Sequence, residues 1–243
     1  ARLDSQNQYL LFTDIIDADS LKSIAHDLGI EQKYNFKIIS LQTNNRFTWN
    51  LFTLPRYLRL HPVDIYHTQY ITPFFASRKI KIITTIHDIS FRVFPQYIKF
   101  SDLLFLRILI PWSLWRADKI IAVSKFTQDE IIRWYPRIPA SKVEIGYNAM
   151  SDEFHYKKYS REALEVVRKK YGLPDKFILY LGTMQPRKNI PCLIEAYAGI
   201  REKVPDTKLV ICGNRKAHNF DLAIDKALEK YSLSEKVIFP GYV

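Results

Sequence analysis

The segment from Phe177 to Gly199 constrains the fold of this chain most, because it predicts a buried strand, a tight turn and an amphipathic helix in direct succession. The apolar run from Phe177 to Leu181 is too short for a helix and ends at Gly182, which is typical of a parallel strand covered on both faces. A helix is predicted from Asn189, a favoured N-cap, because Pro191 fits the first turn and apolar residues then recur at helical spacing. This succession indicates an α/β fold.

A second strand, Lys208 to Gly213, follows this helix and completes one β-α-β unit. The turn that carries Arg187 and Lys188 is therefore expected at the carboxyl end of the first strand. Ligands of open α/β sheets bind at this end, and a helix N-terminus beside two cations suits a diphosphate. The alternative is that Arg187 and Lys188 form a solvated turn without a ligand.

Strands and helices alternate through residues 1–150 without internal repeats, and this alternation favours a doubly wound sheet. Strands are expected at Tyr9–Thr13, Asn35–Leu41, Val63–His67, Lys81–His87, Asp118–Ser124 and Lys142–Gly146. Helices are expected at Asp19–Leu28, Trp49–Leu60, Ser101–Arg116 and from Ser124 to Trp134, and an aromatic-rich loop at Ile89–Tyr97. His67 and His87 end two of these strands at the same edge.

Several motifs resemble those of one enzyme family. The run Leu181-Gly-Thr-Met-Gln-Pro-Arg-Lys-Asn-Ile190, followed by Leu193-Ile-Glu-Ala-Tyr197, resembles the donor-diphosphate motif of the retaining GT-B glycosyltransferases of family 4. Three earlier segments resemble further landmarks of that family in the right order, namely Ile83–Asp88, Arg116–Thr127 and Tyr147–Met150. The motif is long and ordered, and the landmarks come from both halves of the chain.

The resemblance implies a GT-B architecture of two Rossmann-like doubly wound domains that face a cleft. Residues 1–150 would be the acceptor-side domain, 151–175 the linker, and 176–243 part of the nucleotide-sugar donor domain. Because it ends a strand at the same edge as His87, His67 would be a candidate on the acceptor side. The family's first strand and the later part of its donor domain have no counterpart in this sequence.

The resemblance also implies roles for individual residues. His87 would contact the donor sugar and orient the reacting centre, and Arg187 and Lys188 would stabilise the leaving diphosphate. The nucleotide would be held by Gly182, Thr183, Arg187, Lys188, Asn189, Gly241 and Tyr242. Other interpretations stay open, because a lone histidine is more often structural and Gly241-Tyr242 is equally an ordinary strand-to-turn transition.

The expected function is transfer of a hexose, with retention of configuration, from a GDP- or UDP-linked donor to a saccharide or lipid-linked acceptor, as in polysaccharide biosynthesis. No cofactor or metal is expected, because the sequence has no paired carboxylates or His/Cys/Asp cluster of the usual spacing. The alternative is a catalytically incomplete nucleotide-binding or structural fragment of such an enzyme.

The formal net charge of +11 favours anionic partners. A nucleotide sugar meets this expectation, whereas no module for nucleic-acid binding is recognisable. With no signal peptide or spanning segment in the sequence, a cytoplasmic location is expected. The aromatic residues of Phe91–Trp115, interspersed with cations, also predict a peripheral contact with an anionic membrane, unless they form part of the core.

Overall fold

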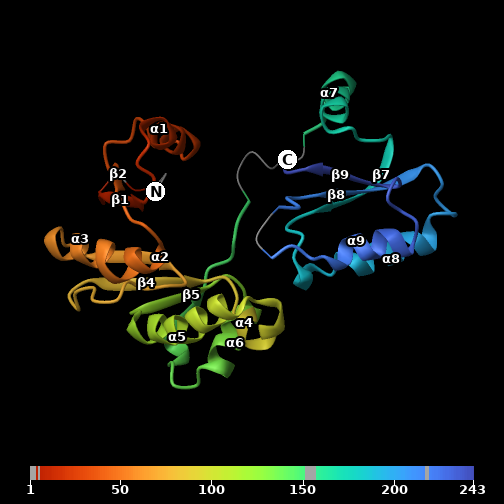
Figure 1. The fold of residues 1–243 in the computed structure, drawn as a ribbon. Coiled ribbons are helices and arrows are strands. Elements are labelled where there is room, and N and C mark those ends of the chain that lie inside the picture. Colours follow the sequence, from red (N-terminus) through yellow and green to blue (C-terminus); the bar gives the residue numbers. More distant parts are fainter. Residues whose placement is uncertain (1–3, 5, 151–156, 217–218) are drawn as a thin grey trace. The chain divides into compact units, whose positions relative to one another are not determined.

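The computed structural model describes residues 4, 6–150, 157–216 and 219–243. The chain divides into two compact units (Figure 1), of which the first comprises Ala1–Arg92 and Leu104–Asn148 and the second Val93–Leu103 and Ala149–Val243. Each unit is described by itself. The domain boundaries expected from the sequence stay a prediction.

The first unit contains two sheets whose strands are all parallel. In one, β1 (Tyr9–Thr13) pairs with β2 (Phe36–Ser40); the other has the order β3-β4-β5-β6, with bounds Ile65–Gln69, Lys81–Ile86, Lys119–Ala122 and Val143–Ile145. All six strands lie close to their predicted positions. The β1-β2 pair is not hydrogen-bonded to β3; instead the Phe12 ring meets the rings of Tyr57 and Tyr66, at centroid distances of 5.4 and 6.2 Å.

The helices of residues 1–150 are α1 (Ala18–Asp27), α2 (Arg46–Thr48), α3 (Leu54–Leu60), α4 (Ser90–Val93), α5 (Phe100–Arg116) and α6 (Lys125–Trp134), with a π-helical turn at Trp49–Thr53. The end of α4 and the start of α5 lie in Val93–Leu103, which belongs to the second unit. Short 3-10 turns occupy Pro95–Tyr97 and Ala140–Lys142. The aromatic loop expected at Ile89–Tyr97 is therefore wrong, because Asp88 accepts a hydrogen bond from the Ser90 backbone N–H (3.0 Å) at the start of α4 and Phe91 is buried.

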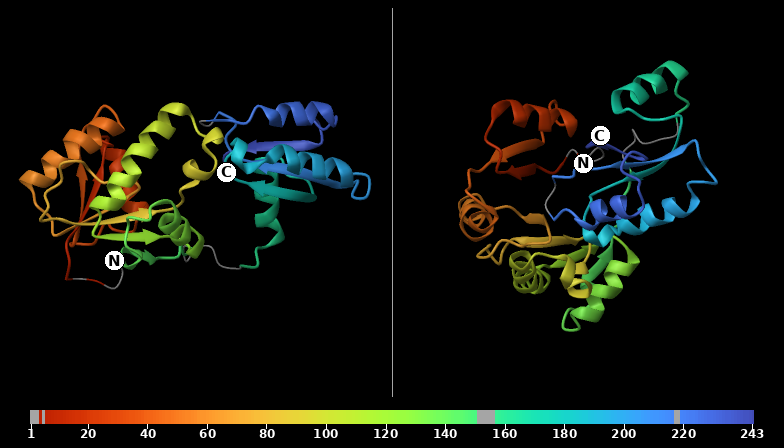
Figure 2. Two further views of the ribbon diagram at one scale, coloured as in Figure 1. Left: turned by 90° about the horizontal axis from the view of Figure 1, so that it is seen from below. Right: turned by 45° about the vertical axis from the view of Figure 1, so that its right-hand side comes forward.

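The core of the first unit lies between β4, β5 and the helices that flank them (Figures 1 and 2). Its fully buried side chains are Leu54, Leu58, Ile82, Ile86, Ile110, Leu114, Ile120 and Ile131. The strand residues in this list come from β4 and β5, the two central strands of the four-stranded sheet.

The second unit has one parallel sheet of order β7-β8-β9, with bounds Lys176–Leu181, Thr207–Cys212 and Val237–Gly241. Two helices, α8 (Ile190–Ile200) and α9 (Ala223–Lys230), pack on this sheet through Ile190, Ile194, Tyr197, Leu209, Ile211, Ile224 and Leu228. The unit also contains α7 (Arg161–Tyr171), which the Ser160 side chain caps, and a 3-10 turn at Pro186–Lys188.

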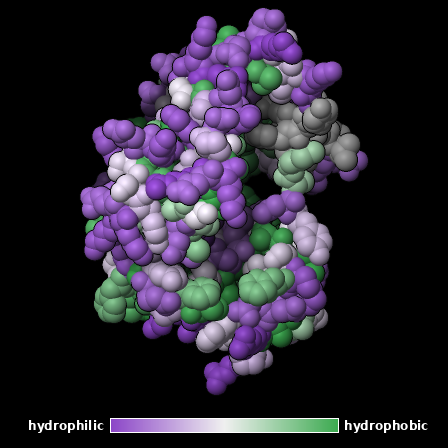
Figure 3. All heavy atoms as spheres, turned by 90° about the vertical axis from the view of Figure 1, so that its right-hand side faces the viewer, coloured by the Kyte–Doolittle hydropathy of each residue, from purple (hydrophilic) through white to green (hydrophobic). Residues whose placement is uncertain are grey.

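The expectation that β7 is covered on both faces is wrong for the described residues. Ile178 and Tyr180 pack against the core, whereas Leu179 and Leu181 are 55% and 68% exposed. Side chains of a strand alternate between the two faces, and α8 and α9 cover one of them. Exposed hydrophobic residues are also visible among the hydrophilic ones in Figure 3. No helix among the described residues is long and apolar enough to cross a membrane.

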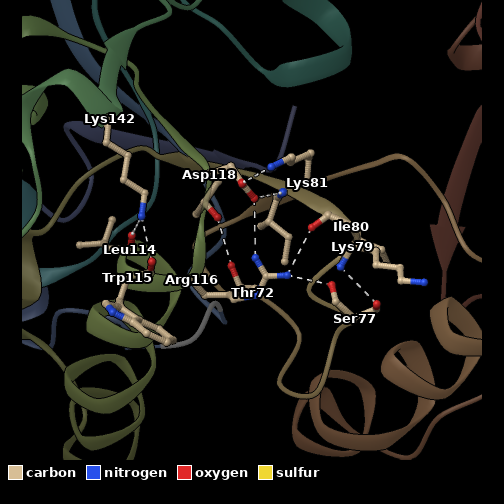
Figure 4. Close-up of polar contacts among 12 residues, drawn as sticks. Thr72, Ser77, Lys79, Ile80, Lys81, Leu114, Trp115, Arg116, Asp118 and Lys142 are labelled. Atoms are coloured by element: carbon tan, nitrogen blue, oxygen red, sulfur yellow. Dashed lines mark hydrogen bonds and ion pairs between the residues drawn. The ribbon is translucent and has the colours of Figure 1, made fainter.

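A polar network ties together the amino-terminal ends of β4 and β5 (Figure 4). The Asp118 carboxylate accepts from the Ile82 backbone N–H (2.9 Å) and from Lys81 Nζ (3.2 Å), and it lies 3.6 Å from Arg116 Nη1. Burial opposes ionisation of Asp118, but these donors outweigh it and lower the pKa of the carboxyl group.

Arg116 and Lys142 in the same network also satisfy backbone carbonyl groups. Arg116 Nη2 donates to the carbonyl oxygens of Ser77 (2.9 Å) and Ile80 (3.3 Å), and Lys142 Nζ donates to those of Leu114 (2.9 Å) and Trp115 (2.8 Å). The last two carbonyls belong to the final turn of α5, where cations are favourable. This network therefore joins the end of α5 to the sheet.

Candidate functional site

The turn between β7 and α8 is anchored at both ends. The Gly182 N–H donates to the Cys212 carbonyl (3.1 Å), and the Tyr180 hydroxyl donates to the Thr183 carbonyl (3.0 Å). Met184 is buried, and its carbonyl accepts from the Asp221 N–H (2.8 Å). The residues that follow, Pro186–Lys188, turn outward as a short 3-10 helix on this fixed base.

A glycine that the sequence analysis treated only as a strand end controls the packing of this edge. A Cβ atom on Gly213 would lie 2.2 Å from the Gly182 carbonyl oxygen, so no larger residue fits without moving the backbone. The Gly213 N–H donates to the Gly241 carbonyl (2.9 Å). Gly182 and Gly241, both predicted to contact nucleotide, are thus brought together through Gly213. The sequence offered one signal for this contact, because Gly213 and Gly182 end the two strands of the same β-α-β unit.

Asn189 occupies the predicted N-cap position of α8, but its side chain makes no cap hydrogen bond. Its backbone is left-handed, at φ 50° and ψ 43°, a conformation that asparagine tolerates better than most residues. The Asn189 carbonyl accepts from the Cys192 N–H (3.2 Å) instead. The expected cap geometry is wrong, and the exposed Asn189 amide group is not used in capping the helix.

Arg187 and Lys188 are both exposed at this turn, directly before the first turn of α8. Arg187 Nε donates to the Gln185 side-chain oxygen (3.1 Å). Within the described part of the chain, neither cation forms an ion pair with a carboxylate. Burial raises the pKa of the neighbouring Tyr180, and the charge of Arg187 acts in the opposite direction. Because Arg187 and Lys188 directly precede α8, their positive charge adds to that of the N-terminal end of the helix dipole.

Three further predicted nucleotide contacts, Gly241, Tyr242 and Thr183, differ in their exposure to solvent. Gly241 ends β9 with φ 91°, a backbone conformation that favours glycine. Tyr242, the next residue, is 87% exposed. Thr183 is exposed between Gly182 and the buried Met184. The structure thus gathers Gly182 and Gly241 at one edge of the sheet and leaves the Tyr242 ring in solvent.

His87 follows β4 in the first unit and is half-buried. The Thr127 hydroxyl donates to its carbonyl (3.1 Å), and the Tyr70 ring lies 5.7 Å from the imidazole. Ser124 accepts from the Thr127 N–H (3.1 Å), which confirms the predicted cap of α6. The contacts of Thr127 and Tyr70 with His87 were missed, since residues far apart in sequence give no pattern for such a contact.

His67, the candidate for the acceptor side, is exposed on β3. Its Nε2 lies 2.8 Å from the Thr85 hydroxyl oxygen on the neighbouring strand β4. This contact holds the ring against the sheet in the middle of β3, where His67 pairs with Ile83. The predicted placement of His67 at the end of its strand, level with His87, is therefore wrong, because β3 continues to Gln69.

No group of three or more His, Cys, Asp and Glu side chains that could hold a metal occurs among the residues with described placement. What the second unit offers instead is a pair of exposed cations directly before a helix start. The backbone N–H groups of Lys188, Asn189 and Cys192 donate to neighbouring backbone carbonyls, so the side chains of Arg187 and Lys188 are the groups that remain suited to an anion. Metal independence stays a prediction.

Comparison with protein families decides the assignment. The model described as Glycosyltransferase Family 4 matches residues 18–154, and the model described as Glycosyl transferases group 1 matches residues 165–243. The chain belongs to glycosyltransferase family 4. The resemblance inferred from the motifs is therefore confirmed.

Curated relatives of this family 4 chain include two enzymes of Escherichia coli. The serotype-specific mannosyltransferase WbdA is 33% identical over 129 residues, which are 53% of this chain and 16% of WbdA. The O-antigen chain mannosyltransferase B is 33% identical over 124 residues, 51% of this chain and 32% of the relative. The chain thus spans a third or less of either protein.

Solved structures show that the fold is of the GT-B type. A glycosyltransferase from Rickettsia africae has a TM-score of 0.63 at 19% identity, covering 98% of this chain and 68% of its own. WaaG, a glycosyltransferase involved in lipopolysaccharide biosynthesis, has a TM-score of 0.59 at 14% identity, covering 97% and 70%. Anabaena HepE, solved with UDP and glucose, has a TM-score of 0.61 at 15% identity, covering 96% and 61%.

Proposed function

We propose that the protein transfers a hexose from a nucleotide-diphosphate donor to an acceptor with retention of configuration. The observation that carries this proposal is the exposed pair Arg187 and Lys188 at the start of α8, neither of which forms an ion pair among the described residues. Two unneutralised cations beside a helix N-terminus suit a diphosphate that gains charge as it leaves.

In this proposal the two cations carry the largest part of the catalysis. As the glycosidic bond to the donor breaks, negative charge builds up on the diphosphate. Charge-assisted hydrogen bonds from Arg187 and Lys188 would each contribute about 1.5–3 kcal/mol to its stabilisation. His87 would contact the donor sugar and orient the reacting carbon. With cations of its own at this position, the protein is expected to need no Mg²⁺.

The donor would be a GDP- or UDP-linked hexose, held by Gly182, Thr183, Arg187, Lys188, Asn189, Gly241 and Tyr242. The relatives WbdA and mannosyltransferase B are described as mannosyltransferases, and HepE was solved with UDP and glucose. The UDP of the HepE structure supports a UDP-linked donor, and the names of the two relatives support mannose as a candidate hexose. The same proposal treats residues 1–150, 151–175 and 176–243 as acceptor-side domain, linker and donor domain.

The acceptor would be a saccharide or a lipid-linked saccharide. A Campylobacter jejuni relative, 35% identical over 127 residues, is described as acting on a diphospho-undecaprenol acceptor. Along α5 an apolar row is open to solvent, namely Phe100 (79% exposed), Leu104 (51%), Ile108 (59%) and Trp115 (60%). Phe91, in contrast, is part of the core at 2% exposed. The open row supports peripheral contact with an anionic membrane at its cytoplasmic face.

Vesicle sedimentation tests this membrane contact. We expect the protein to sediment with anionic vesicles more than with neutral ones, and Ile108→Ser with Trp115→Ser to reduce the bound fraction. Equal and negligible binding to both kinds of vesicle would end the membrane proposal.

Product analysis tests the proposed reaction. The protein is incubated with GDP-mannose or UDP-glucose and saccharide acceptors, with and without EDTA, and the anomeric configuration of the product is read by NMR. We expect a product with the anomeric configuration of the donor and an unchanged rate in EDTA. Nucleotide binding without product would favour the alternative, a nucleotide-binding chain that is catalytically incomplete.

A further inference from the structure

Tyr70, the residue that directly follows β3, has a strained backbone. Its φ of 59° lies in the left-handed region, where a bulky residue is rare and costs about 1–3 kcal/mol. The Ile71 N–H donates to the Gln69 carbonyl (2.7 Å), so the chain makes a three-residue γ-turn about Tyr70. The γ-turn with positive φ at its centre is the rarer, strained form. Strain of this kind persists only where surrounding contacts hold it.

β4 and the residues after it contribute several contacts that hold Tyr70. Its backbone N–H donates to the Thr85 carbonyl (3.0 Å). Its hydroxyl accepts from the Asp88 N–H (3.2 Å) and lies 3.4 Å from the Asp88 carboxylate, to which it donates. Its ring lies against His87, with the centroids 5.7 Å apart and the planes at 36°.

The backbone of His87 and Asp88 is held from other sides as well. The Thr127 hydroxyl donates to the His87 carbonyl (3.1 Å), and the Asp88 carboxylate accepts from the Ser90 N–H (3.0 Å) and hydroxyl (2.7 Å). These contacts fix the main chain and the Asp88 side chain. Among the interactions of the described residues, the contact that reaches the His87 imidazole is the ring of Tyr70.

We propose that Tyr70 is a positioning residue that sets the orientation of the His87 imidazole. The left-handed turn places the phenol ring beside the imidazole, and the hydrogen bonds to Asp88 lock the ring there. A tyrosine that served packing alone would not need a strained turn. The proposal rests on the proposed function only for the catalytic consequence, because the orientation of the ring can be measured without turnover.

The direct test follows the imidazole of His87 by NMR, with histidine side chains labelled with ¹⁵N. In Tyr70→Asn the residue still tolerates the left-handed backbone but has no ring. We expect its His87 ring signals to move, whereas Tyr70→Phe, which keeps the ring, should stay closer to the wild type. Unchanged His87 signals in Tyr70→Asn would overturn the proposal.

Kinetics separate positioning from structure. A poorly oriented reactive group costs about tenfold to a hundredfold in rate, so Tyr70→Asn should lower kcat by that factor with little change in the donor KM. In a His87→Ala background, Tyr70→Asn should cause no further loss, because Tyr70 acts through His87. A further loss of the same factor in that background would overturn the proposal. If His87→Ala alone keeps full activity, the proposed role of His87 fails, and the NMR result still decides whether Tyr70 orients the ring.

A glycine variant tests the strain itself and serves if Tyr70→Asn folds poorly. Tyr70→Gly removes the cost of positive φ but also the ring and its hydrogen bonds, so its melting temperature should stay close to that of Tyr70→Asn, while kcat falls as it does in Tyr70→Asn. Ser232→Gly is the matched control, since Ser232 also has a positive φ (52°) but lies in the second unit, away from the turn before α8. Its kcat should be unchanged. A lower melting temperature in Tyr70→Gly with unchanged His87 signals would show that Tyr70 serves packing alone.

Discussion

Two groups of basic residues differ in how the protein uses their charge. Lys81, Arg116 and Lys142 lie at or just before the amino-terminal ends of β4, β5 and β6, and each donates to a carboxylate or carbonyl oxygen of the protein. Arg187 and Lys188 lie at the carboxyl end of β7, where Arg187 donates to the neutral Gln185 amide. The sequence shows lysines and arginines in both places. What distinguishes them is whether the fold supplies acceptors of its own.

This difference predicts opposite responses to mutation. Removing a cation from the first group leaves partly buried oxygens without a donor, which destabilises the fold. Removing a cation from the second group changes only an exposed turn. The free energy of unfolding should then change little, whereas the affinity for the ligand should fall.

The largest effect on stability is expected for Arg116→Met. The Arg116 side chain is only 14% exposed. Its loss would leave the Ser77 and Ile80 carbonyls without this hydrogen-bond donor and would remove the ion pair with Asp118. We expect a loss of about 2–3 kcal/mol in the free energy of unfolding, measured by urea denaturation. The exposed Arg107→Met on the same helix is the control and should change little. If both variants lowered the free energy of unfolding by equal, small amounts, the first group of basic residues would not differ from the second in its contribution to stability.

A smaller, pH-dependent effect is expected for Asp118→Asn, at about 1–2 kcal/mol near neutral pH. The folded state lowers the pKa of Asp118, so its ionised form adds stability above the unfolded pKa of about 3.9 and loses it as the pH falls through the lower folded value. The difference between wild type and variant should therefore shrink below about pH 4. Urea denaturation at several pH values measures this, with the 91% exposed Asp175→Asn as control. A difference in the free energy of unfolding between wild type and Asp118→Asn that stays constant with pH would contradict a stabilising role of the Asp118 charge.

The smallest effect on stability is expected for Arg187→Ala and Lys188→Ala. Both side chains are exposed, so each variant should unfold within about 0.5 kcal/mol of the wild type. Thermal unfolding followed by circular dichroism gives the answer. A clear loss of stability in either variant would show that the turn is structural and that the two basic groups are alike.

The sequence predicted the strands well because their apolar runs and bounding glycines are local patterns. The Ser124 cap of α6 was visible for the same reason. The exposure of Leu179 and Leu181 was not predictable, because an apolar run reads alike whether one face or two are covered.

The residues that hold the candidate site depend on contacts between distant segments. Gly213 meets Gly182 across two strands, and Tyr70 meets His87 across another pair. Neither contact leaves a periodic trace in the sequence. The left-handed backbone of Asn189 was missed for a different reason, since asparagine suits both an extended cap and a left-handed turn.

The most direct test of the central claim is calorimetric titration of UDP and GDP into the wild type, Arg187→Ala and Lys188→Ala. Each charge-assisted hydrogen bond of about 1.5–3 kcal/mol corresponds to about a tenfold to hundredfold change in Kd. We expect this weakening in each variant for the nucleotide that binds the wild type. Lys176→Ala, at the opposite end of β7, is the control and should bind as the wild type does. Unaltered affinity in both site variants would contradict the account and leave Arg187 and Lys188 as a solvated turn.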